Sequence, residues 1–444
     1  MIIVFHIDSF IQKFIQQINK EAPASLFLYA IIFTCMGGEY MVDIAIIGGG
    51  ASGLVAAIHL ARQGKEVVIL ERNPRIGKKI LATGNGRCNY TNVDLVYEDY
   101  NHPTFVQDIF NQFSVQDTLS FFEDLGIVPK VEKAGKTYPY SEQASSIVDV
   151  LLYEIEQVGV KVLIDTLITD IKKKTFFELY SNQKLILQAK KVLLATGGKA
   201  MPQSGSDGIG YQIAKSLGHT IEPLFPTIGK VVLDFPYLKH LDGLKLETQV
   251  DLVVDGIIVQ SEFGDTLFTG YGISGPTILD CSRKVGVALQ EKKSCHFEVA
   301  MVNHLDKNTL YQRFMNRPLV SIDQALIGLI HKRLIPVVLG LSGIEPKNSL
   351  IQTISPQKII QLIQLLLKLE LKITGLRGFE EAQATAGGVS IHEIDSHTLE
   401  SKIVPGLYFS GEIVDIDGRC GGFNLQWAWS SGIVAASAIA RSLQ

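Results

Sequence analysis

A glycine-rich segment near the start of the chain has the residue types and spacing of a dinucleotide-binding turn. Residues 48–53, Gly-Gly-Gly-Ala-Ser-Gly, match the pattern G-x-G-x-x-G, and Glu71 follows 18 residues after Gly53. In such a turn Gly48 permits the tight bend, Gly50 lets backbone N–H groups approach a pyrophosphate, and Gly53 allows close helix packing. We therefore expect a pyrophosphate to be held by Gly48, Gly50, Ala51, Ser52 and Gly53, and a ribose by Glu71.

This pattern serves both NAD and FAD, and the segment after Glu71 favours the longer flavin cofactor. A bare nicotinamide domain continues directly into its next helix and strand. Here Gly77-Lys78-Lys79 and then residues 83–89, Thr-Gly-Asn-Gly-Arg-Cys-Asn, form an extra glycine-rich loop. Such a loop approaches a flat ligand closely. We expect cofactor contacts from Arg72, Lys78, Thr83, Gly84, Asn85, Gly86, Arg87, Cys88 and Asn89.

Two further glycine-rich segments lie far along the chain. Residues 195–198, Ala-Thr-Gly-Gly, close a strand-like apolar run, and residues 411–426 lead into a helical segment. Free N–H groups and the positive dipole at a helix start suit the negative charge near N1 and O2 of a reduced flavin. The alternatives are an ordinary strand-end turn and simple helix capping. The predicted cofactor contacts are Ala195, Thr196, Gly197, Gly198, Gly411, Glu412, Asp415, Gly422, Phe423, Asn424, Leu425 and Gln426.

Side chains for substrate chemistry are few. Arg87 and Arg419 lie in glycine-rich loops and can anchor an anionic substrate, with pairing to the cofactor or to a carboxylate as the alternative. Lys136, Tyr138 and Tyr140 are candidates for the same cleft, with a tyrosine as proton donor, or else form a turn with packed aromatic rings. No catalytic residue is assigned; the weak candidates are Arg87, Tyr138 and Arg419.

The five cysteines support neither a disulfide scaffold nor a metal site. They are far apart, with no C-x-x-C pair and no histidine at metal-ligand spacing. Cys88 and Cys420 share a Gly-Arg-Cys context, which suggests a thiol redox pair beside the flavin. The alternative is that both are small packing residues.

Composition limits the class of protein. At roughly 100–200 residues per domain, 444 residues suffice for two or three domains. The formal net charge of -4 provides no global positive field, so we expect a small-molecule substrate and no nucleic-acid partner. Low cysteine density and no clear address signal indicate the cytoplasm.

Residues 1–40 differ in character from the rest of the chain. Their apolar run of about eleven residues is shorter than the ~20 needed to span a bilayer, so we expect no stable membrane insertion. A peripheral anchor is one interpretation. We favour the other, that translation starts at Met41.

Hydrophobic periodicity predicts the elements that position these loops. A buried strand over 42–48, a helix over 52–63 and a strand over 66–71 form a βαβ unit. We also expect one helix over 104–126 and a helix capped by Ser141. Alternating segments over 228–302 predict an antiparallel sheet or barrel, followed by helices over 306–369 and a final helix over 425–440.

The ordered segments GGGASG, ERN, GKKILATGNGRCN, ATGG, YGISGP, ATAGGV and GEIVDIDGRCGGFNLQWAWSSG resemble the HI0933-like family of FAD-binding flavoproteins, also labelled YhiN-like, BaiN-like or aminoacetone oxidase family. The resemblance covers residues 42 to 444. It implies an α/β fold in which a Rossmann-like FAD-binding domain, of the two-dinucleotide-binding-domain flavoprotein type, is interrupted by a β-barrel and a small helical domain. It also places Ile168 where related flavoproteins use a backbone contact to adenine.

On this basis we expect six segments. They are an extension at 1–40, FAD-binding parts at 42–222 and 396–444, barrel parts at 223–304 and 370–395, and a helical subdomain at 305–369.

The resemblance implies an FAD-dependent oxidoreductase that transfers a hydride between flavin N5 and a small organic molecule. One family branch reduces unsaturated bile-acid intermediates. A second G-x-G-x-x-G motif after a strand is missing, so NAD(P)H would act as a transient donor. The alternatives are an amine or amino-ketone oxidase that uses oxygen and a non-catalytic flavin-binding redox sensor. RNA modification finds no support in the charge or in a basic-aromatic cluster, and the oligomeric state stays open.

Overall fold

The computed structural model describes residues 41–444, so our predictions for residues 1–40 lie outside the described residues. Its centre is a seven-stranded sheet with β1 (Met41–Ile47) between β2 and β9. β1, β2, β6, β9 and β18 run parallel, and β7 and β8 extend the sheet in antiparallel fashion. The other strands are β2 (Val67–Leu70), β6 (Lys161–Leu163), β7 (Asp170–Lys173), β8 (Phe177–Ser181), β9 (Lys184–Leu194) and β18 (Leu407–Phe409).

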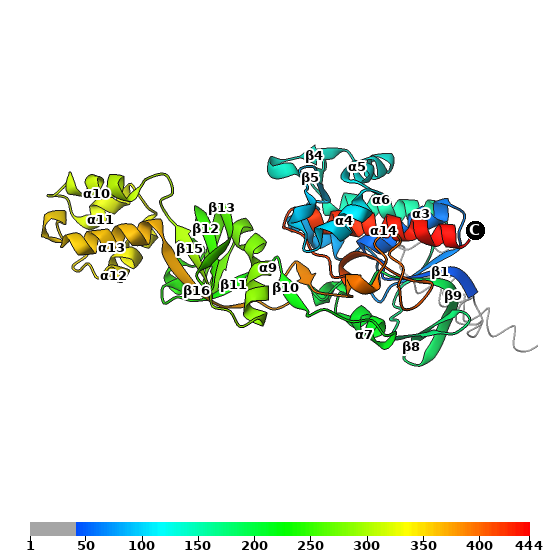
Figure 1. The fold of residues 1–444 in the computed structure, drawn as a ribbon. Helices are drawn as coiled ribbons and strands as arrows, with labels where there is room; N and C mark the ends of the chain where they lie inside the picture. Colours follow the sequence, from blue (N-terminus) through cyan, green and yellow to red (C-terminus); the bar gives the residue numbers. More distant parts are fainter. Residues whose placement is uncertain (1–40) are drawn as a thin grey trace, which may run out of the picture.

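The sheet positions the cofactor loops because its central strands are apolar and parallel. β1 and β2 are almost wholly buried, as expected for strands covered on both faces. α3 (Ala51–Arg62) follows β1 and packs against α14 (Phe423–Ser442), as Figure 1 shows. The predicted βαβ unit and final helix are confirmed. The carboxyl ends of β1, β2 and β9 therefore open at one edge, where ligands bind in such sheets.

Two local predictions were wrong. Residues 104–126 form two helices, because Ser114 and Asp117 make a capping box that starts a new helix. Ser141 does not cap the next helix; its hydroxyl contacts Ser146, and the N-cap position is Gln143. The helices of this domain are α4 (Pro103–Phe110), α5 (Val115–Asp124), α6 (Ala144–Gln157) and α7 (Ile209–Ser216).

A small three-stranded sheet, here called the flap, stands beside these helices. It has the order β3–β5–β4, with antiparallel pairing. The flap carries the predicted residues Lys136 and Tyr138. Its strands are β3 (Thr91–Asn92), β4 (Pro129–Val131) and β5 (Lys136–Pro139).

The predicted antiparallel barrel is confirmed. Six strands close in the order β11–β14–β13–β12–β15–β16, and α9 (Pro276–Gln290) packs against them. The pair β10 (Phe225–Thr227) and β17 (Ala384–Ala386) lies where the chain leaves the cofactor domain and returns to it. The barrel strands are β11 (Val231–Asp234), β12 (Lys245–Val254), β13 (Ile257–Thr269), β14 (Gly272–Ser274), β15 (Cys295–Ala300) and β16 (Leu369–Leu376), with the short α8 (Leu238–Leu241) between β11 and β12.

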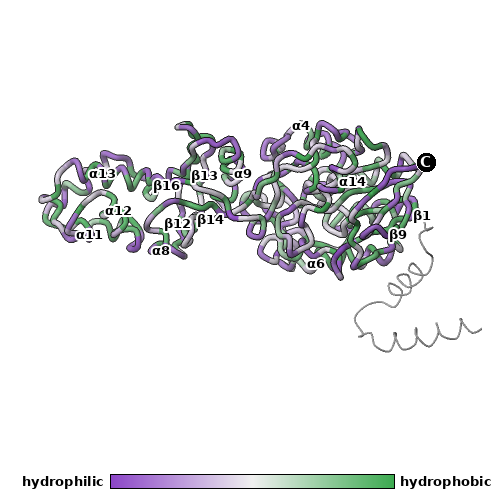
Figure 2. Tube along the Cα trace, turned by 90° about the horizontal axis from the view of Figure 1, so that it is seen from below, coloured by the Kyte–Doolittle hydropathy of each residue, from purple (hydrophilic) through white to green (hydrophobic). Residues whose placement is uncertain are grey.

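Four α-helices between β15 and β16 extend the barrel. They share one apolar core with it, separate from the core of the cofactor domain. Figures 1 and 2 show the cofactor domain, the barrel and these helices in a row. The helices are α10 (Lys307–Met315), α11 (Ile322–Ile327), α12 (Ile335–Leu341) and α13 (Pro356–Leu367). Over residues 41–444, no helix combines the length and apolar character needed to cross a membrane.

Candidate functional site

A pocket opens at the carboxyl ends of the central strands. It contains about 1170 Å³ of empty space, part of it open to solvent. Segments from across the chain form its wall. The predicted residues among its lining are Gly48, Gly50, Ala51, Ser52, Glu71, Arg72, Lys78, Thr83, Ile168, Ala195, Thr196, Gly197, Gly411, Glu412, Asn424 and Leu425.

The three motif glycines meet three different requirements. Gly48 has φ +107°, and a Cβ there would lie 2.4 Å from the backbone oxygen of Ala195. A Cβ at Gly53 would lie 2.1 Å from the backbone oxygen of Gly48. At Gly50 a Cβ would meet no protein atom within 4 Å, so this side of the turn faces open space. The turn is thus compressed against β9 and α3 and open toward the pocket, which fits a pyrophosphate.

Backbone N–H groups at the start of α3 complete the anion site. Ala51 and Ser52 line the pocket, and neither a side-chain cap nor an acidic residue occupies the first turn of the helix. The positive end of the helix dipole therefore faces the pocket uncompensated. These features fit the pyrophosphate of FAD.

Glu71 is fixed at the end of β2. Its carboxylate accepts hydrogen bonds from the backbone N–H of Gly49 at 2.9 Å and from the backbone N–H of Asn73 at 2.8 Å. The side-chain amide of Asn73 donates to it as well, and to the backbone oxygen of Ser204. Glu71 is therefore held in one orientation at the pocket wall, where it fits a ribose.

Residues 203–207, which our sequence reasoning missed, lie against the segment that follows β2. Lys78 donates to the backbone oxygen of Gln203 at 2.6 Å, and Arg72 pairs with Asp207. The two glycines within residues 204–208 could have predicted that this loop lies close to a ligand. The other missed lining residues include Asn73, Lys79, Ser204, Gly205, Ser206, Gln383, Ala384 and Trp427.

An ion pair inside the wall joins three distant segments. Lys79 pairs with Glu412, whose other carboxylate oxygen accepts the backbone N–H of Thr385 at 2.8 Å. Both charged side chains are about one-fifth exposed. Their pairing leaves neither with an unmatched charge and fixes the loop after β18 against the loop after β2.

Other predicted cofactor contacts lie outside this lining. The Gln426 side-chain amide donates to Thr118 and Ser430 inside the core, and Asn89 accepts the backbone N–H of Thr137. Their roles, and those of the rest of this group, stay predictions. The group comprises Gly53, Gly84, Asn85, Gly86, Arg87, Cys88, Asn89, Gly198, Asp415, Gly422, Phe423 and Gln426.

Arg87 is matched by charges within the flap region. Its guanidinium pairs with Glu132 and Glu142 and lies 4.1 Å from the ring centroid of Tyr138. Burial raises the pKa of Tyr138, so its hydroxyl keeps its proton at neutral pH. Tyr140 is 70% exposed. Arg87 thus pairs with carboxylates, which was the alternative to its binding an anionic substrate. Tyr138 retains a proton that it can donate.

Arg419 joins the cofactor domain to the barrel. It pairs with Glu262 at 2.8 Å, with Asp280 at 3.1 Å and with Asp99 at 3.6 Å. The other oxygen of Asp280 accepts the backbone N–H of Cys420 at 2.8 Å. Three carboxylates therefore surround this guanidinium, which leaves it poorly suited to bind an anionic substrate.

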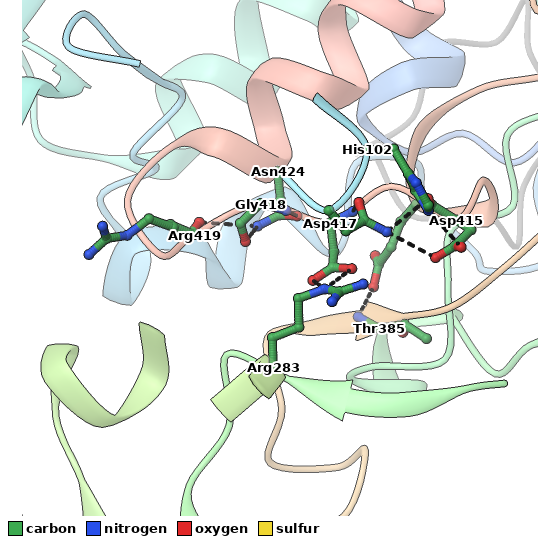
Figure 3. A network of polar contacts seen from close by, with 10 residues as sticks. His102, Arg283, Thr385, Asp415, Asp417, Gly418, Arg419 and Asn424 are labelled. Atoms are coloured by element: carbon green, nitrogen blue, oxygen red, sulfur yellow. Dashed lines mark hydrogen bonds and ion pairs between the residues drawn. The ribbon is translucent and has the colours of Figure 1, made fainter. Parts of the chain in front are cut away.

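A second pair reinforces the same junction. Arg283, one turn beyond Asp280 on α9, donates from Nε to both carboxylate oxygens of Asp417 at 2.9 Å. On the other side of this loop Asp415 contacts His102 at 3.1 Å. Figure 3 shows these side chains converging on the loop that precedes α14. The barrel thus holds the loop that leads into the pocket-lining residues Asn424 and Leu425.

The two cysteines of the thiol-pair hypothesis both lie in surroundings that raise the pKa of the thiol. Cys88 is fully buried, and burial raises its pKa to about 12. Burial, together with nearby Asp280, raises the pKa of Cys420 to about 11. Redox chemistry uses the thiolate. Both environments favour the thiol and so support the packing alternative.

The pocket and its sheet define a dinucleotide-binding α/β protein with an inserted barrel. A family model described as HI0933-like protein Rossmann domain matches residues 42–438. The chain belongs to this HI0933-like family, which confirms both the resemblance and the predicted fold class. It is an FAD-dependent oxidoreductase, as predicted.

Three relatives match over nearly their whole length. A 3-dehydro-bile acid delta(4,6)-reductase from Clostridium scindens is 37% identical over 90% of this chain and 99% of its own. A ribosomal RNA dihydrouridine synthase from Haemophilus influenzae is 31% identical over 91% of this chain and 99% of its own. Another from Escherichia coli is 30% identical over 89% and 97%, respectively.

Substitution of Gly50 separates cofactor binding from folding. A Gly50→Ala methyl group meets no protein atom, and φ is -88° at this position, so the apoprotein should unfold within about 0.5 kcal/mol of the wild type. The methyl group projects toward the pyrophosphate, so we expect FAD affinity to fall about tenfold or more. Titration of apoprotein with FAD and urea unfolding measure the two effects. Gly229→Ala, whose Cβ finds its nearest atom at 3.8 Å, is the control and should change neither.

Asp417 should make stability depend on pH. Burial raises its folded-state pKa from 3.8 to about 6, against the opposing effect of Arg283. The folded state therefore binds the extra proton between these values, and its stability falls as pH rises from about 4 to about 6. We expect the unfolding free energy of the wild type, relative to Asp417→Asn, to fall by up to about 3 kcal/mol across this window and then level off.

Urea unfolding at several pH values measures this difference. Asp43→Asn is the control with the opposite sign, because Lys190 lowers the pKa of Asp43. Relative to that variant, the wild type gains stability as pH rises. A wild-type advantage over Asp417→Asn that grows with pH would contradict the assignment.

Proposed function

We propose that the chain reduces a carbon–carbon double bond conjugated to a carbonyl group. The observation that carries this proposal is the chemistry shared by the full-length relatives. A delta(4,6)-reductase of a 3-dehydro-bile acid saturates bonds conjugated to a ring ketone. Formation of dihydrouridine from uridine saturates the ring bond conjugated to a base carbonyl. One substrate is a bile acid and the other is an RNA, but the reacting group is the same.

The electron balance of this reaction is simple. Bound FAD supplies hydride transfer at N5. The β-carbon of the double bond receives the hydride, and the α-carbon receives a proton. NADH or NADPH is the proposed donor, visiting the cofactor pocket transiently, because the sequence has no second dinucleotide turn after a strand. Each turnover consumes one reduced nicotinamide, one proton and one double bond.

The residues of the pocket divide the binding of FAD between them. The turn at 48–53 and the start of α3 hold the pyrophosphate, Glu71 the ribose, and Ile168 the adenine. Asn424 and Leu425 lie in the first turn of α14, and the positive end of this 20-residue helix would stabilise negative charge on a flavin ring bound there. The loop held by Arg283 and Asp280 keeps that helix start in place.

Tyr138 is the proposed proton donor. It adjoins the pocket loop: a Cβ on Gly84, next to the lining residue Thr83, would lie 3.3 Å from the Tyr138 ring. The stacked Arg87 guanidinium fixes the ring, and the hydroxyl retains its proton at neutral pH. Arg87 and Arg419 then serve as positioning residues, because carboxylates already match their charges.

A small cyclic enone is the first proposed substrate, and the cytoplasm the proposed site of action. Uracil in ribosomal RNA is the second, because two full-length relatives are named for that substrate. The amino-ketone oxidase and the redox sensor remain the alternatives that the experiment must exclude.

Anaerobic spectroscopy of the FAD-loaded protein tests the reaction class. We expect NADH or NADPH to bleach the flavin absorbance near ~450 nm, and 4-androstene-3,17-dione to restore it with formation of the saturated ketone. The 5α-reduced ketone is the control substrate and should restore nothing. Tyr138→Phe should slow reoxidation at least about tenfold and leave reduction by the donor unchanged.

Two results would contradict the proposal. Flavin that no donor reduces would indicate a sensor. Reoxidation by oxygen but by no conjugated ketone and no uracil, with an amino-ketone as reductant, would indicate an oxidase.

A further inference from the structure

The charge of the chain is unevenly distributed. The helical subdomain, residues 305–369, has eight Lys and Arg residues against three Asp and Glu residues, a formal charge of +5. The remaining residues carry -9, which brings the whole chain to -4. We expected no nucleic-acid partner from the net charge of the whole chain. That net charge averages the positive charge of the helical subdomain with the negative charge of the remaining residues. A local positive surface is the electrostatic property that polyanion binding requires.

Most of these positive charges are exposed and unmatched. Six of the eight basic side chains are exposed and have no ion pair within residues 41–444, whereas Lys368 pairs with Glu298 of the barrel. Of the three acidic residues, Asp306 is used as the N-cap of α10. The six are Lys307, Arg313, Arg317, Lys332, Lys347 and Lys358.

Three of these cations lie in the segment from the last turn of α10 to the start of α12. Arg313 lies in the last turn of α10, and Arg317 follows two residues after this helix ends at Met315. The Arg313 guanidinium reaches α11, where a Cβ on Gly328 would lie 3.9 Å from Nη2. Lys332 follows four residues after Gly328 and begins a short 3-10 helix, Lys332–Leu334. We call Arg313, Arg317 and Lys332 the basic cluster.

The basic cluster is remote from the cofactor pocket. In Figures 1 and 2 the helical subdomain and the cofactor domain occupy opposite ends of the molecule, with the barrel between them. A small substrate bound at the flavin cannot touch it. A partner that used both sites would have to extend along the molecule while its reacting group enters the pocket.

We propose that the helical subdomain is a docking surface for RNA, bound through its phosphates. The proposal rests on the second substrate of the proposed function, a uracil within ribosomal RNA. RNA matches the observed properties: it is a polyanion, it spans separated sites, and it carries the conjugated base that the pocket would reduce. Phosphate contacts of this kind give affinity and position, while the cofactor pocket selects the base.

Binding to the intact, oxidised, FAD-loaded protein tests the docking surface without turnover. The probes are protein-free ribosomal RNA and a fluorescein-labelled oligouridine of about thirty nucleotides, titrated at several salt concentrations. The variant Arg313→Gln/Arg317→Gln/Lys332→Gln removes three charges. We expect the salt dependence, the slope of log K against log[salt], to weaken by about 2, and affinity to fall about tenfold or more.

The control variant is Lys184→Gln/Lys215→Gln/Lys292→Gln. It removes three exposed lysines that have no ion pair within the described residues and lie outside the subdomain. Its RNA affinity and salt dependence should match the wild type. Equal losses in the two variants would overturn the proposal, as would binding to phosphatidylglycerol vesicles in place of RNA.

Turnover of the small enone separates this proposal from the proposed function. Both triple variants should reduce 4-androstene-3,17-dione at the wild-type rate, because none of the substituted residues lines the pocket. If no protein reduces the enone or uracil but RNA binding still depends on the basic cluster, the reaction class fails and the docking surface stands. If the enone is reduced and RNA does not bind, only the docking surface fails.

Discussion

The close approach of two backbones at the end of β1 is the constraint on which the rest of the structure depends. Gly48 lies against the backbone of Ala195 at the end of β9, and Gly53 lies against Gly48 itself. No side chain fits at either contact, so the strand can turn sharply into α3 with its N–H groups directed outward. The parallel sheet brings the loops after β2 and β9 to the same edge. One local packing requirement thereby creates an anion site and gathers the walls around it.

The second organising feature is the charged junction between cofactor domain and barrel. α9 presents Asp280 and Arg283 one turn apart, and they bind Arg419 and Asp417 on one loop. That loop leads into α14, whose first turn lines the pocket. The position of the barrel is thus coupled to the geometry of the flavin site. Arg419, which looks like a substrate anchor in the sequence, instead joins the two bodies.

Local features of the site were predictable, and contacts between distant segments were not. The turn at 48–53 and Glu71 follow from spacing, because one βαβ unit holds both. Lys79 and Glu412 meet only after the sheet has assembled, and no local pattern pairs them. One local signal was missed, because the apolar spacing over 104–126 continues across a break that the Ser114–Asp117 capping box marks. Whole-chain charge likewise concealed the positive helical subdomain, because the acidic remainder outweighs it.

The central claim is that the pocket holds one FAD through its pyrophosphate and adenosine half. Calorimetric titration of flavin-free protein with FAD and separately with FMN tests it most directly, since FMN lacks the pyrophosphate bridge and the adenosine. We predict one FAD bound per chain, with FMN binding at least about a hundredfold more weakly, the loss of two to three good polar contacts. Equal affinity for the two flavins, or no binding of either, would contradict this claim.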